Sequence, residues 1–460
     1  MSSKLKQFLQ DSERKAFDLD HRQKIRFNIG KYNAAVQNGL AAYDNHELAR
    51  QRASFLKTQT INNLDKYLME FEKNFIQRGG KVIWAQNTQE ALREIGAIMK
   101  RKRAKSVVKS KSMSTEEIHL NDYLEKNGIE TVETDLGEYI VQLAEQRPYH
   151  IVTPAMHMSK KDISELFTKK LGIPPTDDAQ QLVLTARKLL RDKYTQAEVG
   201  ITGANFLIAD IGGIAVTENE GNARLSTTFP KTHIAVVGIE KLIPSMLDLD
   251  LFWPLLSTSG TGQNITIYNT ILTGPRQPTE KDGPEEMYVV LLDNGRTNLL
   301  AQPEQREALN CIRCGACLNV CPVYKNIGGH TYETTYSGPI GSVITPHLAG
   351  FEENKHLSYA SSLCGACTSV CPVKINLHGL LLANRRYSVE QGLVDKNEKL
   401  AFRFWTYGMK NRKLLNFAPA AVKNFVLKRV QKDTWAVRRE PLLAAPETFT
   451  DMWRKQRGNE

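Results

Sequence analysis

The stretch Cys311-Ile-Arg-Cys314-Gly-Ala-Cys317-Leu-Asn-Val-Cys321-Pro322 has the spacing C-x2-C-x2-C-x3-C-P. Bacterial ferredoxins use this run to hold one iron–sulfur cluster with three cysteines, while the fourth cysteine reaches a second cluster. Such a loop wraps a compact cube only if it is tight, and Gly315 and Ala316 keep it free of bulky side chains. Structural zinc sites usually combine two C-x2-C pairs across a longer loop. The spacing therefore predicts iron–sulfur ligation.

A second, shorter run is Cys364-Gly-Ala-Cys367-Thr-Ser-Val-Cys371-Pro372, with the spacing C-x2-C-x3-C-P. In paired runs of this kind, the last cysteine of each run serves the cluster of the other run. This rule assigns four cysteines to the first cluster: Cys311, Cys314, Cys317 and Cys371. It leaves three cysteines for the second cluster: Cys321, Cys364 and Cys367. We therefore expect two [4Fe-4S] clusters, the second with only three cysteine ligands.

The missing ligand of the second cluster falls at Ser361 when the two runs are aligned. Seven thiolates cannot fill eight corners, so the fourth corner is Ser361, Ser362, another protein oxygen or nitrogen, or a ligand from a partner. If this corner has no ligand at all, the second cluster is a [3Fe-4S] cluster. His330 and His378 are conceivable ligands, although histidines more often form hydrogen bonds or face solvent.

All seven cysteines of the 460 residues lie between Cys311 and Cys371. An odd number of clustered cysteines, in a chain without an apolar signal peptide at residues 1–15, argues against disulfides and for metal ligation. No stretch approaches the ~20 apolar residues that span a bilayer, so we expect a cytoplasmic protein. Two clusters with interleaved ligands suit electron relay, whereas the purely structural cluster of some DNA-repair enzymes is usually single.

The composition is that of a globular chain, with 41% hydrophobic and 24% charged residues, and the length suggests about three domains. We expect a helical arm over residues 1–77 and an α/β domain over 78–296. A helical ferredoxin-type domain with two clusters is expected over 297–393, followed by a basic helical tail over 394–460. The overall fold class is therefore multidomain, α/β plus α.

The segment from 78 to 296 alternates short β-branched runs with helical stretches, which predicts a mainly parallel sheet covered by helices. A hairpin turn is expected at Asp210-Ile-Gly-Gly213. The expected strands cover residues 81–84, 106–108, 129–132, 150–153, 205–209, 214–217, 234–237, 265–268 and 288–292.

The stretch from Thr202 to Arg224 reads as strand, glycine turn and strand, and it ends with Glu218, Glu220 and Arg224. Because α/β domains bind ligands at strand ends, we expect a small anionic ligand near Glu218, Arg224 and the Lys109-Ser-Lys111 segment. Glu218 or Glu220 is also the candidate nucleophile of a coenzyme A transferase-like enzyme, although such carboxylates more often serve turns. A sensor that binds a ligand and reports redox state through the clusters is a third class.

The chain resembles the lactate utilization protein B family, the iron–sulfur subunit of the bacterial L-lactate oxidation system. The residues that carry the resemblance are Lys109-Ser-Lys-Ser-Met113, the stretch from Thr202 to Arg224, and Ser362-Leu-Cys-Gly-Ala-Cys-Thr-Ser-Val-Cys-Pro-Val-Lys374. The cysteine runs alone occur in many oxidoreductases, but their combination with the preceding domain is specific.

The resemblance implies an α/β domain with the fold of ribose-phosphate isomerases and coenzyme A transferases, followed by an α-helical ferredoxin-type domain. It also implies that the protein acts beside two companion subunits, A and C, and carries electrons from L-lactate as it becomes pyruvate, which allows growth on lactate. All seven cysteines carry over as cluster ligands, including the three-ligand second cluster. No dinucleotide-binding Gly-x-Gly-x-x-Gly motif is present, so we expect an electron-transfer subunit rather than a chain that itself takes hydride from lactate.

Positive charge is concentrated near the end of the chain. From residue 395 to 460 there are 15 Lys and Arg against 7 Asp and Glu, an excess of eight within a net charge of +11. A basic segment attracts acidic proteins, anionic membranes or nucleic acid. We expect an acidic companion or peripheral contact with a membrane, and no nucleic acid.

Overall fold

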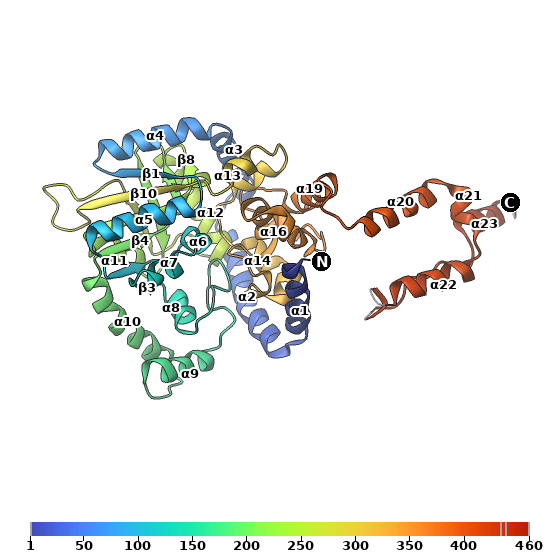
Figure 1. Ribbon diagram of the computed structural model, residues 1–460, viewed down its shortest axis with the longest axis horizontal. Helices are drawn as coiled ribbons and strands as arrows, with labels where there is room; N and C mark the ends of the chain where they lie inside the picture. Colours follow the sequence, from blue (N-terminus) through green and yellow to red (C-terminus); the bar gives the residue numbers. More distant parts are fainter. Residues whose placement is uncertain (1, 433–434, 438, 459–460) are drawn as a thin grey trace. The chain divides into compact units, whose positions relative to one another are not determined.

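The computed structural model describes residues 2–432, 435–437 and 439–458 (Figure 1). The chain divides into two compact units, Met1–Ser388 and Val389–Glu460. The first unit contains an α/β core, the N-terminal helices and the cysteine-rich region. The expected combination of a parallel α/β domain and a helical cysteine-rich domain is confirmed.

A six-stranded, all-parallel sheet forms the centre of the first unit, in the order β1-β10-β7-β4-β2-β3. Along β7, Ile234 and Val236 belong to one core, and Ala235 and Val237 belong to the core on the opposite face. Burial of both faces is typical of parallel sheets covered by helices. The strands are β1 Lys81–Ala85, β2 Ser106–Lys109, β3 Glu130–Glu133, β4 Val199–Thr202, β7 Thr232–Gly238 and β10 Glu286–Leu292.

A smaller, four-stranded sheet has the order β8-β5-β6-β9. Its strands β5 and β6 form the predicted antiparallel hairpin. Gly212 in the turn has φ +57, and a Cβ there would lie 2.3 Å from the backbone nitrogen of Phe75, so no larger residue fits. The strands are β5 Phe206–Ile208, β6 Gly213–Glu218, β8 Leu242–Ile243 and β9 Tyr268–Leu272.

Two strand predictions need correction, and the strands β4 and β8 were not predicted. Residues 150–153 form a turn because Nδ1 of His150 accepts the backbone N–H groups of Val152 and Thr153, at 3.1 and 3.3 Å. The run at 265–268 lies almost entirely before its strand, which begins at Tyr268. The central strand β4 was not expected, because its four residues contain a glycine and give a weak periodic signal.

Helices of the α/β core flank the large sheet (Figure 1). Ala91 and Ile95 of α5 and Leu124 of α7 pack with strand residues such as Val107 and Val290 in one core. The helices are α5 Thr88–Lys102, α6 Met113–Glu117, α7 Leu120–Lys126, α8 Leu136–Leu143, α9 Lys160–Leu171, α10 Ala179–Gln196, α11 Asn222–Thr228 and α12 Leu249–Thr261.

The N-terminal helices contact both the α/β core and the cysteine-rich region. Helix α2 packs on both α12 and α15, and α3 packs on β8 and on the segment before Cys311. Phe8, Ile25 and Phe71 share one continuous core with Cys314 and Cys317. The arm therefore joins the sheet to the cysteine-rich region. Its helices are α1 Ser3–Phe17, α2 Leu19–Leu40, α3 His46–Asn62 and α4 Leu64–Gln77.

The cysteine-rich region consists of short helices, as its lack of β-branched periodicity predicts. Its helices are α13 Arg296–Leu300, α14 Ala316–Val320, α15 Pro322–Ile327, α16 Gly338–Leu348, α17 Phe351–Asn354, α18 Ala366–Ser369 and α19 Leu377–Glu390.

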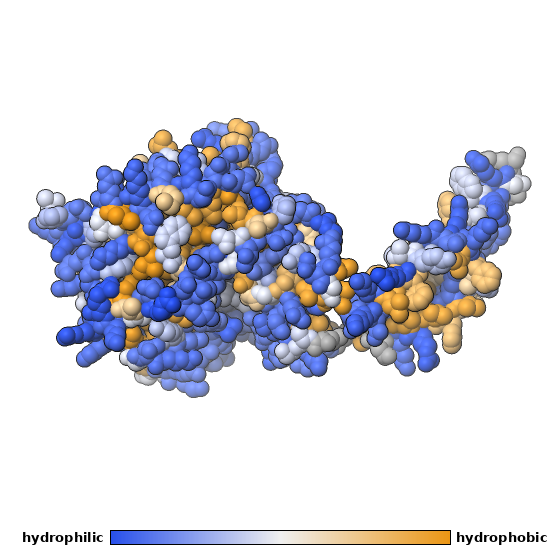
Figure 2. Space-filling model, turned by 45° about the horizontal axis from the view of Figure 1, so that its top comes forward, coloured by the Kyte–Doolittle hydropathy of each residue, from blue (hydrophilic) through white to orange (hydrophobic). Residues whose placement is uncertain are grey.

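The second unit is helical and exposes many apolar side chains. Helix α20 has no buried residue, and Phe404 and Trp405 are 69% and 61% exposed. Apolar and hydrophilic surfaces alternate on this unit in Figure 2. Among the described residues, no helix combines the length and the apolar character needed to cross a membrane. The helices are α20 Lys396–Lys410, α21 Arg412–Phe417, α22 Ala420–Gln431 and α23 Phe449–Arg457.

Candidate functional site

Four of the seven cysteines line one small cavity. They are Cys311, Cys314, Cys317 and Cys371. Ile312, Ile340 and Val373 complete an apolar wall around the sulfur atoms. The loop turns at Gly315, with φ +79, where a Cβ would lie 3.0 Å from Val152 and 3.2 Å from His150. A glycine is therefore needed both for the turn and for the close approach of the α/β domain.

Backbone N–H groups point at the sulfur atoms of this set. The N–H of Arg313 donates to Sγ of Cys311 and the N–H of Ile375 donates to Sγ of Cys371, each at 3.4 Å. Such donors favour the thiolate, whereas burial raises the pKa of Cys371 to about 12. A bound iron removes the thiol proton. Four sulfur donors around one apolar cavity, three of them buried and Cys311 half-buried, fit an iron–sulfur cluster.

The other three cysteines form a second, more open set: Cys321, Cys364 and Cys367. Cys321 and Cys367 are buried, whereas Cys364 is exposed. Burial, and then the neighbouring Cys321, raise the pKa of Cys367 to about 11. The N–H of Ala366 and the hydroxyl of Ser362 lower the pKa of Cys364.

Ser361, the position of the missing cysteine, has a local backbone role. Its hydroxyl accepts the N–H of Leu363 at 3.1 Å, and its carbonyl accepts a bond from Arg385 at 3.3 Å. The Ser362 hydroxyl instead lies against the Cys364 sulfur. Ser362 therefore lies beside the second set, whereas the bonds of Ser361 are to Leu363 and Arg385. His330 bonds to the carbonyl of Arg147 and His378 to the hydroxyl of Thr368.

The four cysteines of the first set line the wall of a cavity. Within the ranges that the structure describes, no three His, Cys, Asp or Glu side chains converge closely enough to hold one ion. A zinc site needs its sulfur ligands about 2.3 Å from the metal. The first cysteine set instead surrounds a cavity, as a cluster with an iron at each corner requires.

A buried network of charges anchors the first cysteine loop to the sheet. Glu240 accepts hydrogen bonds from Nε of Arg296 at 2.5 Å and from Nη2 of Arg313 at 3.1 Å. Glu117 pairs with Arg296 at 2.8 Å and accepts the hydroxyl of Tyr336 at 2.7 Å. Burial acts to raise the pKa of Glu240, but the two arginines outweigh it and lower the pKa to about 2. Glu240 is therefore ionised at neutral pH.

Helix α3 holds the end of the second cysteine run. Nε and Nη2 of Arg50 donate to the carbonyl of Cys371 at 3.1 and 2.9 Å, and Nη2 also donates to the carbonyl of Ser369 at 2.7 Å. Nζ of Lys57 donates to the carbonyls of Glu240 and Leu242 at 2.6 and 3.0 Å. The N-terminal arm thus fixes the backbone beside the first cysteine set.

A larger cavity of about 410 Å³ lies between the α/β domain and the first cysteine loop, which contains Arg313 and Cys314. One wall follows the carboxyl ends of β2 and β4, where parallel sheets usually bind ligands. The opposite wall includes Arg313 and Cys314 of the first cysteine loop. Polar lining residues include Lys111, Glu218, Glu220 and Lys241. A ligand in this cavity would therefore lie against Cys314 of the first cysteine set.

Only some of the residues expected to bind an anion line this cavity. Ser110, Lys111 and Glu218 do so, and so does Glu220, the other candidate nucleophile. Lys109 is fully buried and pairs with Glu133 at 2.7 Å and Glu116 at 3.0 Å. Arg224 lies 5.2 Å above the ring of Tyr268, and its side chain is not part of the cavity wall.

The two candidate glutamates differ in their environment. The carboxylate of Glu218 accepts the N–H groups of Ala223 at 2.7 Å and Arg224 at 3.0 Å, so it caps the start of α11. Glu220 accepts the N–H of Leu136 at 3.0 Å at the exposed mouth of the cavity. Removal of water by the surrounding protein, and then Asp135, raise its pKa to about 7. Glu218 thus has the structural role that is usual for such carboxylates.

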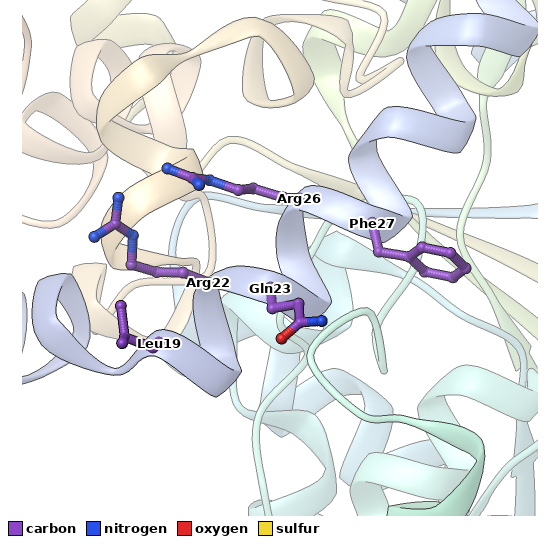
Figure 3. A pocket seen from close by; sticks show the side chains of 5 residues that line it. All are labelled: Leu19, Arg22, Gln23, Arg26 and Phe27. Carbon is purple, nitrogen blue, oxygen red and sulfur yellow. The ribbon is translucent and has the colours of Figure 1, made fainter.

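The sequence did not single out Lys241, Arg313 or Tyr336. The sequence signal that could have identified Arg313 is its charge, because a charged residue inside a C-x2-C loop that surrounds a cluster needs a buried partner. Lys241 and Tyr336 reach the cavity only through long-range folding. A separate hollow along α2 is lined by Leu19, Arg22, Gln23, Arg26 and Phe27 (Figure 3). It lies on one helix and contains no group for catalysis or metal binding.

Comparisons with known proteins agree with this architecture. The LUD domain model matches residues 68–292, and the 4Fe-4S dicluster domain model matches residues 307–375. The latter match indicates that the chain binds iron–sulfur clusters.

Several curated relatives match most of the chain. The lactate utilization protein B of Anoxybacillus flavithermus is 46% identical over 428 residues, covering 90% of each chain. That of Bacillus licheniformis is 47% identical over 387 residues, covering 83% of this chain and 81% of the relative. That of a Geobacillus strain is 46% identical over 448 residues, covering 95% and 93%.

Proposed function

The chain belongs to the lactate utilization protein B family, and on that premise we propose that it relays electrons released when L-lactate is oxidised to pyruvate. The observation that carries the proposal is the pairing of two cysteine sets, one beside a ligand-sized cavity and the other with an exposed member, Cys364. When bound, iron–sulfur clusters accept and release single electrons. This chain would supply the cysteine ligands of the clusters, set the distance between the clusters, and determine which cluster a partner protein can reach.

The first set, Cys311, Cys314, Cys317 and Cys371, would hold a [4Fe-4S] cluster. The second set, Cys321, Cys364 and Cys367, would hold the second cluster, with an oxygen ligand or none at its fourth corner. Cys317 and Cys321 stand four residues apart on and just after α14, about 6 Å along a helix. Because they belong to different sets, clusters held by the two sets would lie close enough for electron transfer between them.

The difference in exposure gives the relay two ends. Cys314 is buried and faces the large cavity, whereas Cys364 is exposed. Electron exchange with another protein is therefore favoured at the Cys364 end. The family name implies a lactate utilization system, and we propose that the companion subunits A and C dock there and supply the electrons.

Reconstitution tests this function. The full chain with both clusters is mixed anaerobically with the two companions, and L-lactate is added. Visible absorption of the clusters should bleach, and should not bleach when either L-lactate or the companions are omitted. Unchanged absorption during pyruvate formation would reject the relay.

A coenzyme A transferase would behave differently in the same preparation. It would turn over an acyl-coenzyme A and a carboxylate without any change in the clusters, and Glu220→Gln would abolish that turnover. The cap role of Glu218 leaves Glu220 as the glutamate available for such chemistry.

A further inference from the structure

Arg313 occupies an unusual position between the first cysteine set and the large cavity. It lines both cavities, its side chain is 7% exposed, and its backbone has φ +62, a conformation that few residues other than glycine adopt. Nη2 donates to Glu240, and the guanidinium lies 4.5 Å from the centre of the Tyr336 ring. The loop thus holds an arginine where a glycine would be easier to accommodate.

Part of this guanidinium has no hydrogen-bond partner. Nε and Nη1 of Arg313 are buried and unbonded among the described residues. An arginine carries five donors and remains charged in proteins. Leaving buried donors unsatisfied costs about 1–3 kcal/mol, and more for charged groups. The three N–H groups on these two nitrogens therefore point to an acceptor that the described residues do not supply.

Lys241 adds a second positive charge at the same end of the cavity. It lies at the end of the short turn Ile239–Lys241 after β7 and lines the large cavity only. Its main charged neighbours are Arg313, Glu240, Cys311 and Arg296. Those of Glu220 are Asp135, Lys111 and Glu218 instead. The cavity therefore has one end rich in cations, beside the first cysteine set, and a mixed end with several carboxylates.

We propose that this cavity binds an organic anion whose carboxylate or phosphate group is held by Arg313 and Lys241, against the Cys314 side of the first cluster. The planar fork of an arginine suits either group. The volume of about 410 Å³ lies within the range of sites for drug-sized ligands, so it admits an anion larger than lactate. Hydroxyl or amine groups at the other end of the ligand would meet Glu218, Glu220 and Asp135.

Binding is measured by calorimetry on the full chain with both clusters loaded, under nitrogen. L-Lactate and pyruvate serve as carboxylate probes, and inorganic phosphate and coenzyme A serve as phosphate probes. We expect one-to-one binding of at least one probe with a Kd below 1 mM. The probe that gives heat on binding identifies whether the anionic group is a carboxylate or a phosphate.

Paired variants locate the site. Lys241→Met should weaken binding at least tenfold, whereas Lys241→Arg, which keeps the charge, should stay within threefold of the parent. Arg224→Gln is the matched control, because Arg224 lies near Glu218 but outside the cavity wall, and it should leave binding unchanged. Arg313→Lys should weaken binding at least threefold, because it keeps the charge but loses the fork.

A second readout places the anion beside the first cluster. Electron paramagnetic resonance of the reduced chain should show a shift in the signal of the first cluster when the probe is added, with the second cluster unaffected. The proposal is overturned if none of the four probes binds, or if Lys241→Met binds as tightly as the parent. It is also overturned if Lys241→Met shifts the reduction potential of the first cluster without affecting binding, because the cations would then serve only to neutralise the cluster. None of these results depends on electron flow from lactate, so the relay is tested separately.

Discussion

Replacing Glu240 with glutamine tests whether the buried charge network holds the first cysteine loop in place. Glu240 is 1% exposed and accepts hydrogen bonds from Arg296 and Arg313. Removing one partner of a buried ion pair costs about 3–5 kcal/mol, because the remaining charge is left uncompensated. Arg296 keeps Glu117 at 2.8 Å, whereas Arg313 loses its carboxylate. We therefore expect a loss of about 3 kcal/mol, at the lower end of that range.

The free energy of unfolding is obtained from urea titrations of the cluster-loaded chain under nitrogen, followed by circular dichroism. Glu304→Gln is the matched control, because its pair with Arg386 leaves both side chains more than half exposed, at 53% and 57%. Exposed pairs contribute about 0–1 kcal/mol. The Glu240 variant should also lose the first cluster before the second. A loss below about 1 kcal/mol, equal to that of the control, would refute the role assigned to the network.

Four further outcomes are expected. Cys371→Ser should disrupt the first cluster and spare the second in Mössbauer and paramagnetic resonance spectra; damage to the second cluster alone would disprove the crossed assignment. Mild oxidation should produce a three-iron signal from the second cluster, and Ser361→Cys should suppress it; an unchanged signal would show that Ser361 does not face the vacant corner. The hydrogen bonds from Lys102, Lys81 and Tyr288 lower the pKa of Glu286 from 4.5 to about 2, so its stabilisation is complete above pH 4.5 and disappears as the pH falls towards 2. In urea titrations, Glu286→Gln should therefore be less stable than the parent at pH 6 and approach it near pH 3, and a constant difference would contradict this sign. Deleting residues 395–460 should weaken pull-down of the companions or binding to anionic vesicles. Binding of the parent chain should fall between low and moderate salt, since exposed charges are screened beyond about 10 Å at 0.1 M. Undiminished binding after the deletion would rule out a docking role for the tail.

The sequence predicted those features that local patterns determine. The parallel sheet follows from alternating β-branched and helical stretches, and the hairpin at Asp210–Gly213 follows from its paired glycines. The turn at 150–153 was missed because it depends on the His150 side chain, which competes for the backbone N–H groups that a strand would use.

The cavity residues depend on contacts between distant segments. The sequence grouped Lys109 with Lys111 as cations for a ligand. In the structure, Lys109 forms ion pairs with Glu133 and Glu116 inside the domain. Arg313 and Lys241 meet only because the cysteine loop packs against the end of the sheet. Spacing along the chain contains no information about that contact.

Counting electrons in the clusters is the most direct test of the relay. The cluster-loaded chain and its companions are mixed with a limiting amount of L-lactate, frozen within the first turnover, and examined by paramagnetic resonance. Oxidation of one lactate to pyruvate releases two electrons and two protons, so the account predicts two reduced centres per pyruvate, one electron in each cluster. Pyruvate formation with both clusters still oxidised would contradict it.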